Sequence, residues 1–549
     1  MSEGGYRLVA EALEGAAGER GKLAKMARLA EALAPLDGAR LAIAARLLSG
    51  SPFAEWEQQV TSAGWATVAR AASTVTGWDL ETLGACAGAI GDLGEAIGLL
   101  VDPKDDSAEP LTILEVDETL RGLAKQRKAV EKQKTIEGLL ARATPVEAKY
   151  LVKTLSGGLR TGADVLTIEE AIAKAFQADR EEVARARRDC GDIGETAVAA
   201  RQGRLPSITF RLFHPIGFML ATPIEDPAEV EAELSEFAIE EKFDGIRAHA
   251  HKSGSRVALF SRTLDDITKR FPEITLAMAL APGEFLLDGE IVAWKDSRPD
   301  SFFRLQRRLG RKEPPDEILK EIPAAFIAYD CLARDGVPLF ETPWRERRRH
   351  LEEIAAAWER MHLSRVSRAS NAEELEALFA RARANGNEGL MLKRFDSTYQ
   401  AGKRGKQWRK WKKALATLDV VVTAVEQGHG KRAGMLSDYT FAVRDGDRLV
   451  NIGKAYSGLT DEEIRTMGAH FRKITTGRYG PVRAVAPEVV IEVAFDTIQK
   501  SNRHKSGFAL RFPRIVRLRP DKTPAQATTL EEVRQLYASI VGAPSPGSD

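Results

Sequence analysis

The distribution of apolar residues changes twice along this chain of 549 residues, and those two changes constrain the fold more than any single motif. Up to about residue 205 the spacing is helical. In 120–143, for example, Leu123 and Ile136 lie among many charged residues, as in an amphipathic helix. Thr144-Pro145 then predicts the cap and the first position of another helix. The first part of the chain is therefore expected to be all helical.

Short strands with turns between them are expected after a linker at 201–206. Strands are predicted at 285–294, 325–332 and 389–393, with helices at 344–358 and 372–384. Beyond about residue 415 the strand pattern, at 418–425, 439–443, 449–452 and 489–495, is typical of a small β-barrel. The predicted domains are 1–205 (helical), 206–415 (α+β) and 416–541 (β-barrel), followed by a disordered Gly/Pro/Ser-rich tail at 542–549.

The composition excludes several classes of protein. Lys+Arg 80 against Asp+Glu 79 gives a net charge of +1, so any anion-binding surface must come from local clustering of basic residues. No apolar run has the length of a signal peptide or a membrane span, and we expect a cytoplasmic protein without a membrane partner. Cys86, Cys190 and Cys331 cannot form a four-thiolate zinc site by themselves and are expected to be reduced.

The string EEKFDGIR at 240–247 is the strongest chemical signal. It places Lys242 directly before the apolar Phe243, and a lysine attacks an electrophile only as the neutral amine. Burial or a nearby cation can lower a lysine pKa from about 10.4 far enough for that. Gly245 would let the backbone approach a nucleotide closely, and Arg247 offers a planar fork of donors to phosphate. A nucleophilic lysine beside a phosphate site is the resulting hypothesis, although a solvated turn has the same pattern.

Acidic residues lie within apolar strands further along the chain. Asp288 and Glu290 share one face of the strand at 285–294, where their charges need a neutralising partner. An arginine, a hard divalent ion or a ribose hydroxyl would suit them, while a solvated face is the alternative. Tyr329 and Asp330 point to opposite faces of the next strand, and Tyr329 is either a base-stacking residue or part of the core.

Two basic segments could contact a polyanion. In 403–413, an extended chain would direct Trp408, Lys410 and Lys412 to one side, and the interleaved tryptophans favour partial burial against a polyanion. In 155–164, glycines surround Arg160 just before a helix expected to open at Thr167. Backbone amides at a helix start can bind a DNA phosphate, although an ordinary glycine-rich cap has the same sequence.

Taken in order, these motifs resemble those of the ATP-dependent DNA ligases, which belong to the covalent nucleotidyltransferase superfamily. The matching segments are 242–247, 261–262, 288–290, 329–330, 388–393, 408–413 and 519–522. Three more, 156–162, 510–514 and 524–529, resemble the bacterial and archaeal ligases that carry an N-terminal DNA-binding domain. The resemblance extends from about residue 130 onward, and before that point only the helical character supports it.

The resemblance implies a helical DNA-binding domain, an α+β nucleotidyltransferase (adenylation) domain with antiparallel sheets, and a C-terminal OB-fold β-barrel. It implies an enzyme that uses ATP, with Mg²⁺ or Mn²⁺, to seal nicks in double-stranded DNA. The expected intermediates are a lysyl-AMP enzyme and an adenylated 5′-phosphate, which the 3′-hydroxyl attacks. A monomer working at the nucleoid is expected.

The resemblance also implies roles for single residues. Lys242 becomes the nucleophile that carries AMP, with Glu240 beside the adenine and Tyr329 stacked on it. Glu290 and Glu388 are implied to help hold the metal ion. The implied nucleotide-binding residues are Glu240, Arg247, Arg262, Glu290, Tyr329, Arg404, Lys410, Lys412, Asp521 and Lys522. Asp521 and Lys522 would close over ATP from the last domain. The candidates for DNA contact are Lys149, Lys153 and Arg160.

Five alternatives are less well supported. RNA ligases and capping guanylyltransferases share the lysine motif but do not account for the helical N-terminal region or for the segment RFPR at 511–514. An NAD-dependent ligase usually adds a four-cysteine zinc module, and the P-loop sequence of many ATPases is missing from the chain. A catalytically dead DNA clamp would not need Lys242.

Overall fold

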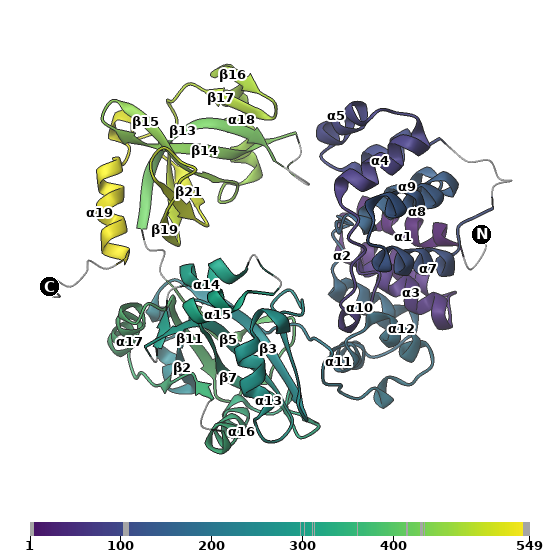
Figure 1. Cartoon of the computed structure of the whole chain (residues 1–549), viewed down its shortest axis with the longest axis horizontal. Coiled ribbons are helices and arrows are strands. Elements are labelled where there is room, and N and C mark those ends of the chain that lie inside the picture. Colours follow the sequence, from purple (N-terminus) through teal and green to yellow (C-terminus); the bar gives the residue numbers. More distant parts are fainter. Residues whose placement is uncertain are drawn as a thin grey trace. The chain divides into compact units, whose positions relative to one another are not determined.

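A computed structural model describes residues 5–541 apart from 103–108, 297, 301, 310, 312, 359–360, 413–415, 429–431 and 433. The chain forms two compact units: Met1–Thr76 with Val101–Lys413, and Gly77–Leu100 with Ala414–Asp549. Figure 1 follows the chain through helices, then a mixed region, then a mostly β region. The tail predicted at 542–549 lies outside the described residues. None of the helices in the described part of the chain is long and apolar enough to cross a membrane.

The N-terminal region is helical, as predicted. Its helices in the first unit are α1 (Tyr6–Gly18), α2 (Lys22–Leu33), α3 (Gly38–Ser49), α4 (Trp65–Thr76), α7 (Ile113–Lys125), α8 (Ala129–Arg142), α9 (Pro145–Leu155), α10 (Val165–Ala175), α11 (Arg180–Cys190) and α12 (Ile193–Arg201). The helices α5 (Leu80–Ile90) and α6 (Leu93–Leu100) belong to the second unit.

The prediction of one continuous helix over 120–143 is wrong, because α7 ends and α8 begins within this range. Gln126, where α7 ends, has an extended backbone, and its side-chain amide donates to Thr135 Oγ1 at 2.9 Å. The apolar periodicity runs across this break and therefore did not reveal it. The next prediction is confirmed: Thr144 caps α9, Pro145 is its first residue, and the Thr144 N–H donates to Glu147.

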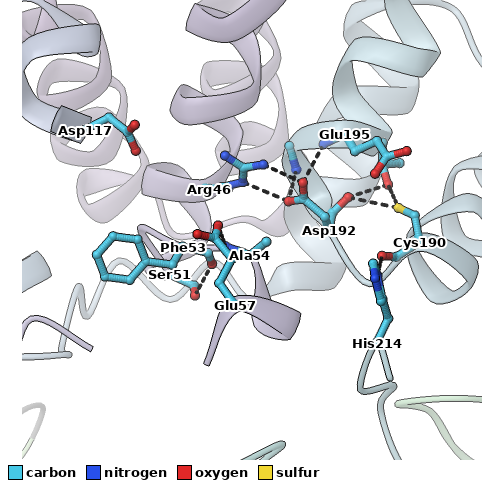
Figure 2. Close-up of polar contacts among 12 residues, drawn as sticks. Arg46, Ser51, Phe53, Ala54, Glu57, Asp117, Cys190, Asp192, Glu195 and His214 are labelled. Carbon is cyan, nitrogen blue, oxygen red and sulfur yellow. Dashed lines mark hydrogen bonds and ion pairs between the residues drawn. The ribbon is translucent and has the colours of Figure 1, made fainter. Parts of the chain in front are cut away.

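A buried ion pair joins α3 to the start of α12 (Figure 2). Arg46 donates from Nε to Asp192 Oδ1 at 2.9 Å and from Nη2 to Oδ2 at 2.5 Å. The same carboxylate caps α12 by accepting the N–H groups of Gly194 and Glu195. A Cβ atom on Gly194 would lie 2.6 Å from the carbonyl oxygen of Ala42, so only glycine permits this close helix approach.

The central region contains two sheets whose strands pair mostly antiparallel. One sheet has the order β1-β12-β11-β2-β10, and the other has the order β4-β3-β5-β7-β8, with β6 paired to β5 and β9 to β7. Only the pairs β1·β12 and β7·β9 are parallel among the described strands of these sheets.

The strand bounds in this region are β1 (Leu220–Ile224), β2 (Phe237–Lys242), β3 (Ile246–Ser253), β4 (Arg256–Ser261), β5 (Phe285–Lys295), β6 (Arg298–Asp300), β7 (Ala324–Arg334), β8 (Val337–Pro338), β9 (His362–Leu363), β10 (Val366–Ser367), β11 (Gly389–Arg394) and β12 (Arg404–Trp411). The helices are α13 (Pro272–Ala279), α14 (Phe302–Leu309), α15 (Asp316–Glu321), α16 (Trp344–Ala357) and α17 (Ala372–Ala384).

The prediction that tryptophans in the basic segment are buried against a polyanion is wrong. Trp408 and Trp411 are each 1% exposed, and they lie in two different hydrophobic cores. Trp408 packs with Tyr399 and Trp411 with Phe379, on opposite faces of β12. Alternation along the strand thus anchors β12 between two cores and leaves lysines on its surface.

The C-terminal part is β-rich. Its strands are β13 (Ala416–Gln427), β14 (Leu436–Asp445), β15 (Arg448–Ala455), β16 (Thr475–Tyr479), β17 (Val482–Val485), β18 (Val490–Phe495), β19 (Thr497–Lys500), β20 (Phe508–Arg511) and β21 (Arg514–Leu518), with helices α18 (Asp461–Lys473) and α19 (Leu530–Val541). The long strand β13 pairs with β14, β17 and β18 around a core that includes Val420, Phe441 and Val493.

We expect Asp192→Ala to destabilise the helical region by about 3–5 kcal/mol, because it leaves the largely buried Arg46 without a partner and uncaps α12. Asp37→Ala is the control, since Asp37 pairs with Arg40 at an exposed helix start and should cost less than about 1 kcal/mol. Amide hydrogen exchange over α3 and α12 measures both effects. Equal protection in the two variants would contradict this account of the pair.

Candidate functional site

Lys242 is the last residue of β2 and lies beside the start of β11. Its register partner is Gly389, and its carbonyl oxygen accepts the N–H of Glu388 at 2.8 Å. A Cβ atom on Gly389, whose φ is +151°, would lie 2.2 Å from the carbonyl oxygen of Trp411. Glycine is therefore required where β11 passes between its two neighbours, and it brings Glu388 next to Lys242.

The Lys242 ammonium forms an ion pair with Glu388. Nζ lies 2.5 Å from Glu388 Oε2, and the two side chains are 24% and 28% exposed. Lys412 Nζ lies 3.8 Å from the same oxygen. Burial raises the pKa of Glu388, but the charges of Lys242 and Lys412 outweigh it and hold that pKa below its usual range. Glu388 is therefore an ionised carboxylate between two lysines.

Glu290 lies close to this group and is in a different electrostatic state. Burial raises the pKa of Glu290 to about 8, with further raising from Glu388 and Asp288, although Lys242 and Arg247 oppose it. Gly245 packs directly on this strand: a Cβ atom there would lie 2.8 Å from Glu290 Cγ and 2.3 Å from the Ile291 carbonyl oxygen. The glycine is thus needed for the bend between β2 and β3 to pack on β5, as well as for any contact with a nucleotide.

Arg247 neutralises Asp288 on β5, so an arginine is the partner that this buried acid requires. Its Nε donates to Oδ1 at 3.1 Å and its Nη2 to Oδ2 at 2.6 Å, while Nη1 donates to the Met219 carbonyl oxygen. The Tyr399 hydroxyl donates to the same carboxylate at 2.8 Å. Burial raises the pKa of Asp288, but Arg247 and His249 hold it far below its usual range. Asp288 is thus a buried anchor for Arg247.

Glu240 is 2% exposed and its carboxylate is held on several sides. Lys393 Nζ lies 2.6 Å from Oε2, the Ser364 hydroxyl donates to Oε1 at 3.0 Å, and Arg348 Nη1 lies 3.5 Å from Oε1. Lys393 Nζ also lies 4.2 Å from the centroid of the Tyr329 ring. Glu240 and Tyr329, both predicted to lie near the base, are therefore brought together by Lys393.

Tyr329 is partly buried on β7, and its ring also lies 5.8 Å from the Arg247 guanidinium. Its neighbour Asp330 points to the opposite face, as predicted, where it forms a fully buried bidentate pair with Arg347 at 2.8 Å for both bonds. The alternation along β7 leaves the tyrosine ring on the side of Arg247 and Lys393.

Several cations converge on Lys410. Burial and the charges of Arg404, Lys242, Lys412 and Arg262 hold the pKa of Lys410 below its usual range. Arg404 is exposed and donates from Nη1 to the Ala221 carbonyl oxygen at 2.8 Å, and Arg262 is exposed directly after β4. Such a concentration of positive charge is unfavourable in the protein alone and favours a bound polyanion such as a triphosphate.

Asp521 and Lys522 lie in the C-terminal unit, where both are engaged. Arg519 pairs with Asp521, with Nη2 2.7 Å from Oδ2, while Lys522 Nζ donates to Asp419 Oδ2 at 2.6 Å. Arg519 also donates to Asp419 at 2.8 Å. The two predicted residues thus belong to one charged network around Asp419.

The residues predicted to contact DNA differ in accessibility. Lys149 is 12% exposed and pairs with Glu14 at 2.6 Å, and Lys153 is 4% exposed. Both ammonium groups lie near the ring of Tyr150. Arg160 is exposed on the loop before α10, with a φ of +54°. DNA contact by these three residues stays a prediction, and burial favours Arg160 over the two lysines.

The helix after this loop begins earlier than predicted. It starts at Val165, and Asp164 caps it by accepting the Thr167 N–H at 2.9 Å. The Asp164 carboxylate therefore already binds one of the backbone amides at this helix start. The sequence does not reveal this cap by itself, because Asp164 also fits the end of the glycine-rich loop.

Sequence reasoning also missed the residues that position the site. Tyr399, Ser364 and Arg348 carry no motif of their own, and only the fold brings them to Asp288 and Glu240. No group of three or more potential metal ligands occurs among the described residues. Glu388 lies near enough to Glu290 for its charge to raise the pKa of Glu290. The two residues therefore form a pair of carboxyl groups in which Glu388 is the ionised one.

Comparison with known proteins agrees with this geometry. The family described as "ATP dependent DNA ligase domain" matches residues 218–412, "DNA ligase N terminus" matches 5–173 and "ATP dependent DNA ligase C terminal region" matches 432–522. The chain is 44% identical to a "Probable DNA ligase" of Koribacter versatilis, over 97% of this chain and 96% of that protein. It is 35% identical to a "DNA ligase" of Methanoculleus marisnigri, over 97% of both proteins.

A solved structure named "Pmar-Lig_PreS3" shares the fold, with a TM-score of 0.59 and 18% identity over 93% of this chain and 99% of that one. The order helical region, α+β region with antiparallel sheets and β-rich region is thus confirmed. Since the curated relatives span almost the whole chain and the three family matches follow one another along it, the chain belongs to the ATP-dependent DNA ligases, enzymes that use ATP to join DNA.

Proposed function

We propose that Lys242 is the residue that takes AMP from ATP, and that the enzyme uses this adduct to seal nicks in double-stranded DNA. The observation that carries the proposal is the gathering of positive charge around Lys410, next to a lysine whose partner carboxylate, Glu388, lies at 2.5 Å. Lys410, Lys412, Arg404 and Arg262 would hold the phosphates, and Glu240 with Tyr329 would hold the base.

The first step forms a bond between Lys242 Nζ and the α-phosphorus and breaks the bond from that phosphorus to the bridging oxygen, so pyrophosphate leaves. Nζ must first lose a proton, and Glu388 is the acceptor at hand. AMP then passes to the DNA 5′-phosphate and frees the lysine. The 3′-hydroxyl finally attacks that phosphorus, the phosphodiester forms and AMP leaves. In-line geometry and matched cations are the protein's main contribution.

We further propose that Glu290 and Glu388 hold a divalent metal ion, Mg²⁺ or Mn²⁺. Glu290 fits this role because it is a partly buried carboxyl with a raised pKa of about 8, for which a cation would favour the ionised form. Bound there, the ion would supply positive charge to the phosphate oxygens.

The remaining proposals concern the chain as a whole. Domain boundaries at 205 and 415 are supported by the end of α12 at Arg201 and by the start of β13 at Ala416. We propose a C-terminal OB-fold, a monomer, and a cytoplasmic enzyme that works at the nucleoid, where its DNA substrate lies. The roles of Asp521 and Lys522 in closing over ATP belong to the same proposal.

Lys242→Ala should abolish formation of a covalent AMP adduct, because it removes the amine that is proposed to attack the α-phosphorus. The measurement is incubation with α-labelled ATP and a divalent metal, followed by denaturing electrophoresis. Lys406→Ala is the matched control, since Lys406 is an exposed lysine of β12 and should leave labelling intact. A labelled Lys242→Ala protein would overturn the assignment, and a labelled wild type that joins no nicked DNA would overturn the sealing step.

Glu290→Gln should stabilise the nucleotide-free protein, and more so as the pH rises. The pKa of Glu290 in the folded protein, about 8, exceeds its ordinary value, so the folded state holds an extra proton between those pH values and loses stability as the pH rises through them. Thermal unfolding should show equal midpoints near pH 5 and a higher midpoint for the variant at pH 8, about 2–4 °C for each kcal/mol. Glu376→Gln, on the exposed face of α17, should show no such trend.

Lys522→Ala should slow AMP transfer to the enzyme more than it slows sealing of a nick that is already adenylated, because Lys522 is proposed to act on the departing pyrophosphate only. Rates of adduct formation and of single-turnover sealing measure the two steps. Arg534→Ala, an exposed change on α19, is the control. Equal slowing of both steps by Lys522→Ala would show that the residue supports the C-terminal unit in general.

A further inference from the structure

The hairpin formed by β16 and β17 carries two arginines that face each other. Arg478 and Arg483 are register partners across the two antiparallel strands. Like charges directly opposite each other in a sheet destabilise it. Figure 1 shows these strands in the C-terminal region, where β16 ends the strand order β15-β14-β13-β17-β16. The hairpin therefore presents its charges at a sheet edge.

A third arginine adds to this pair. Arg472 lies in the last turn of α18, directly before β16, and it is exposed, as is Arg478. Burial and the charges of Arg478 and Arg472 hold the pKa of Arg483 below its usual range, so both of these arginines act on the Arg483 guanidinium. Lys473 follows Arg472 and is exposed too.

These charges are not compensated by the protein. Between Ile464 and Pro487 the sequence contains no aspartate or glutamate. None of the three arginines takes part in an ion pair or a side-chain hydrogen bond with any residue that the structure describes. Glu488, the next acid along the sequence, faces His470 at 3.9 Å. Glu426, whose register partner is Val482 on β17, pairs with Lys454 at 2.9 Å.

The hairpin of β14 and β15, at the other end of the same sheet, places an arginine opposite a carboxylate. On β14 and β15, Asp445 is the register partner of Arg448, so a carboxylate faces the arginine. On α19, Arg534 lies 3.2 Å from Glu531. The cluster on β16 and β17 differs from these two arrangements, because its register partners carry the same charge.

We propose that Arg472, Arg478 and Arg483 form a binding surface for the phosphate backbone of duplex DNA. This goes beyond the proposed nucleotide chemistry but rests on DNA being the substrate. Arginine forks bind phosphate oxygens in pairs, and a row of backbone phosphates supplies negative charge at the spacing of adjacent side chains. Tyr479, 72% exposed at the end of β16, gives the surface an amphipathic ring beside these charges. Contacts of this type position DNA without reading its sequence.

The test compares R478Q/R483Q with the matched control R448Q/R534Q in the full-length enzyme. Fluorescence anisotropy measures the Kd for a nicked duplex whose 3′ end lacks the hydroxyl, over a series of KCl concentrations. We expect the slope of log K against log salt to become shallower by about 1 for each arginine in the test variant, whereas the control keeps the wild-type slope. An unchanged slope would overturn the proposal and leave an acidic protein partner as the occupant.

Two further measurements keep the result unambiguous. R478K/R483K retains both charges and should retain most of the slope, and a slope as shallow as that of R478Q/R483Q would contradict binding of DNA phosphates by these charges. Thermal unfolding of R478Q/R483Q should show an equal or higher midpoint than wild type, because a like-charge pair has been removed. AMP labelling is scored separately: a protein that takes no AMP contradicts the proposed function, whereas a labelled protein with an unaltered slope contradicts only this surface.

Discussion

The pairing of Arg247 with Asp288 is the interaction on which the proposed nucleotide pocket depends. It joins β3 to β5 by two parallel bonds, and the third donor group of Arg247 reaches the chain before β1 at the Met219 carbonyl oxygen. The Tyr399 hydroxyl donates a further hydrogen bond to the Asp288 carboxylate. The arginine is therefore fixed in place by protein groups before any nucleotide arrives, and little of its conformational entropy remains to be lost on binding.

Buried pairs of a basic residue and a carboxylate recur as connections between elements. Arg347 and Asp330 join α16 to β7, Arg46 and Asp192 join α3 to α12, and Lys393 with Glu240 joins β11 to β2. Burying such pairs contributes little net stability, since desolvation offsets the attraction. Their geometric demands are strict, so they specify one arrangement of the strands and helices, and that arrangement is what a phosphate site requires.

Most of the fold could be predicted from periodicity. The strands at 285–294, 325–332 and 389–393 and the helix at 372–384 fall within one or two residues of their observed bounds. Periodicity failed where a local polar contact overrode it, as at Gln126, where the helix stops although the apolar pattern continues. The candidate site was predictable only for residues within motifs. The partners that hold them, such as Tyr399 and Ser364, are distant in sequence and have no signature. The prediction for Trp408 and Trp411 was wrong because an aromatic residue in a basic segment can pack in a hydrophobic core as well as against a ligand.

The position of Glu388 between two lysines has a consequence for the direction of the reaction. While Lys242 is an ammonium, the carboxylate has two cationic neighbours. A phosphoramide nitrogen carries no positive charge, so an AMP adduct on Lys242 would remove one of them and add a negative phosphate nearby. The local charge would fall by two, and Glu388 would keep Lys412 as its ion-pair partner. The new phosphate would lie among the cations around Lys410, so positive charge that is unfavourable in the free enzyme would favour the adduct and help the enzyme to hold AMP until DNA arrives.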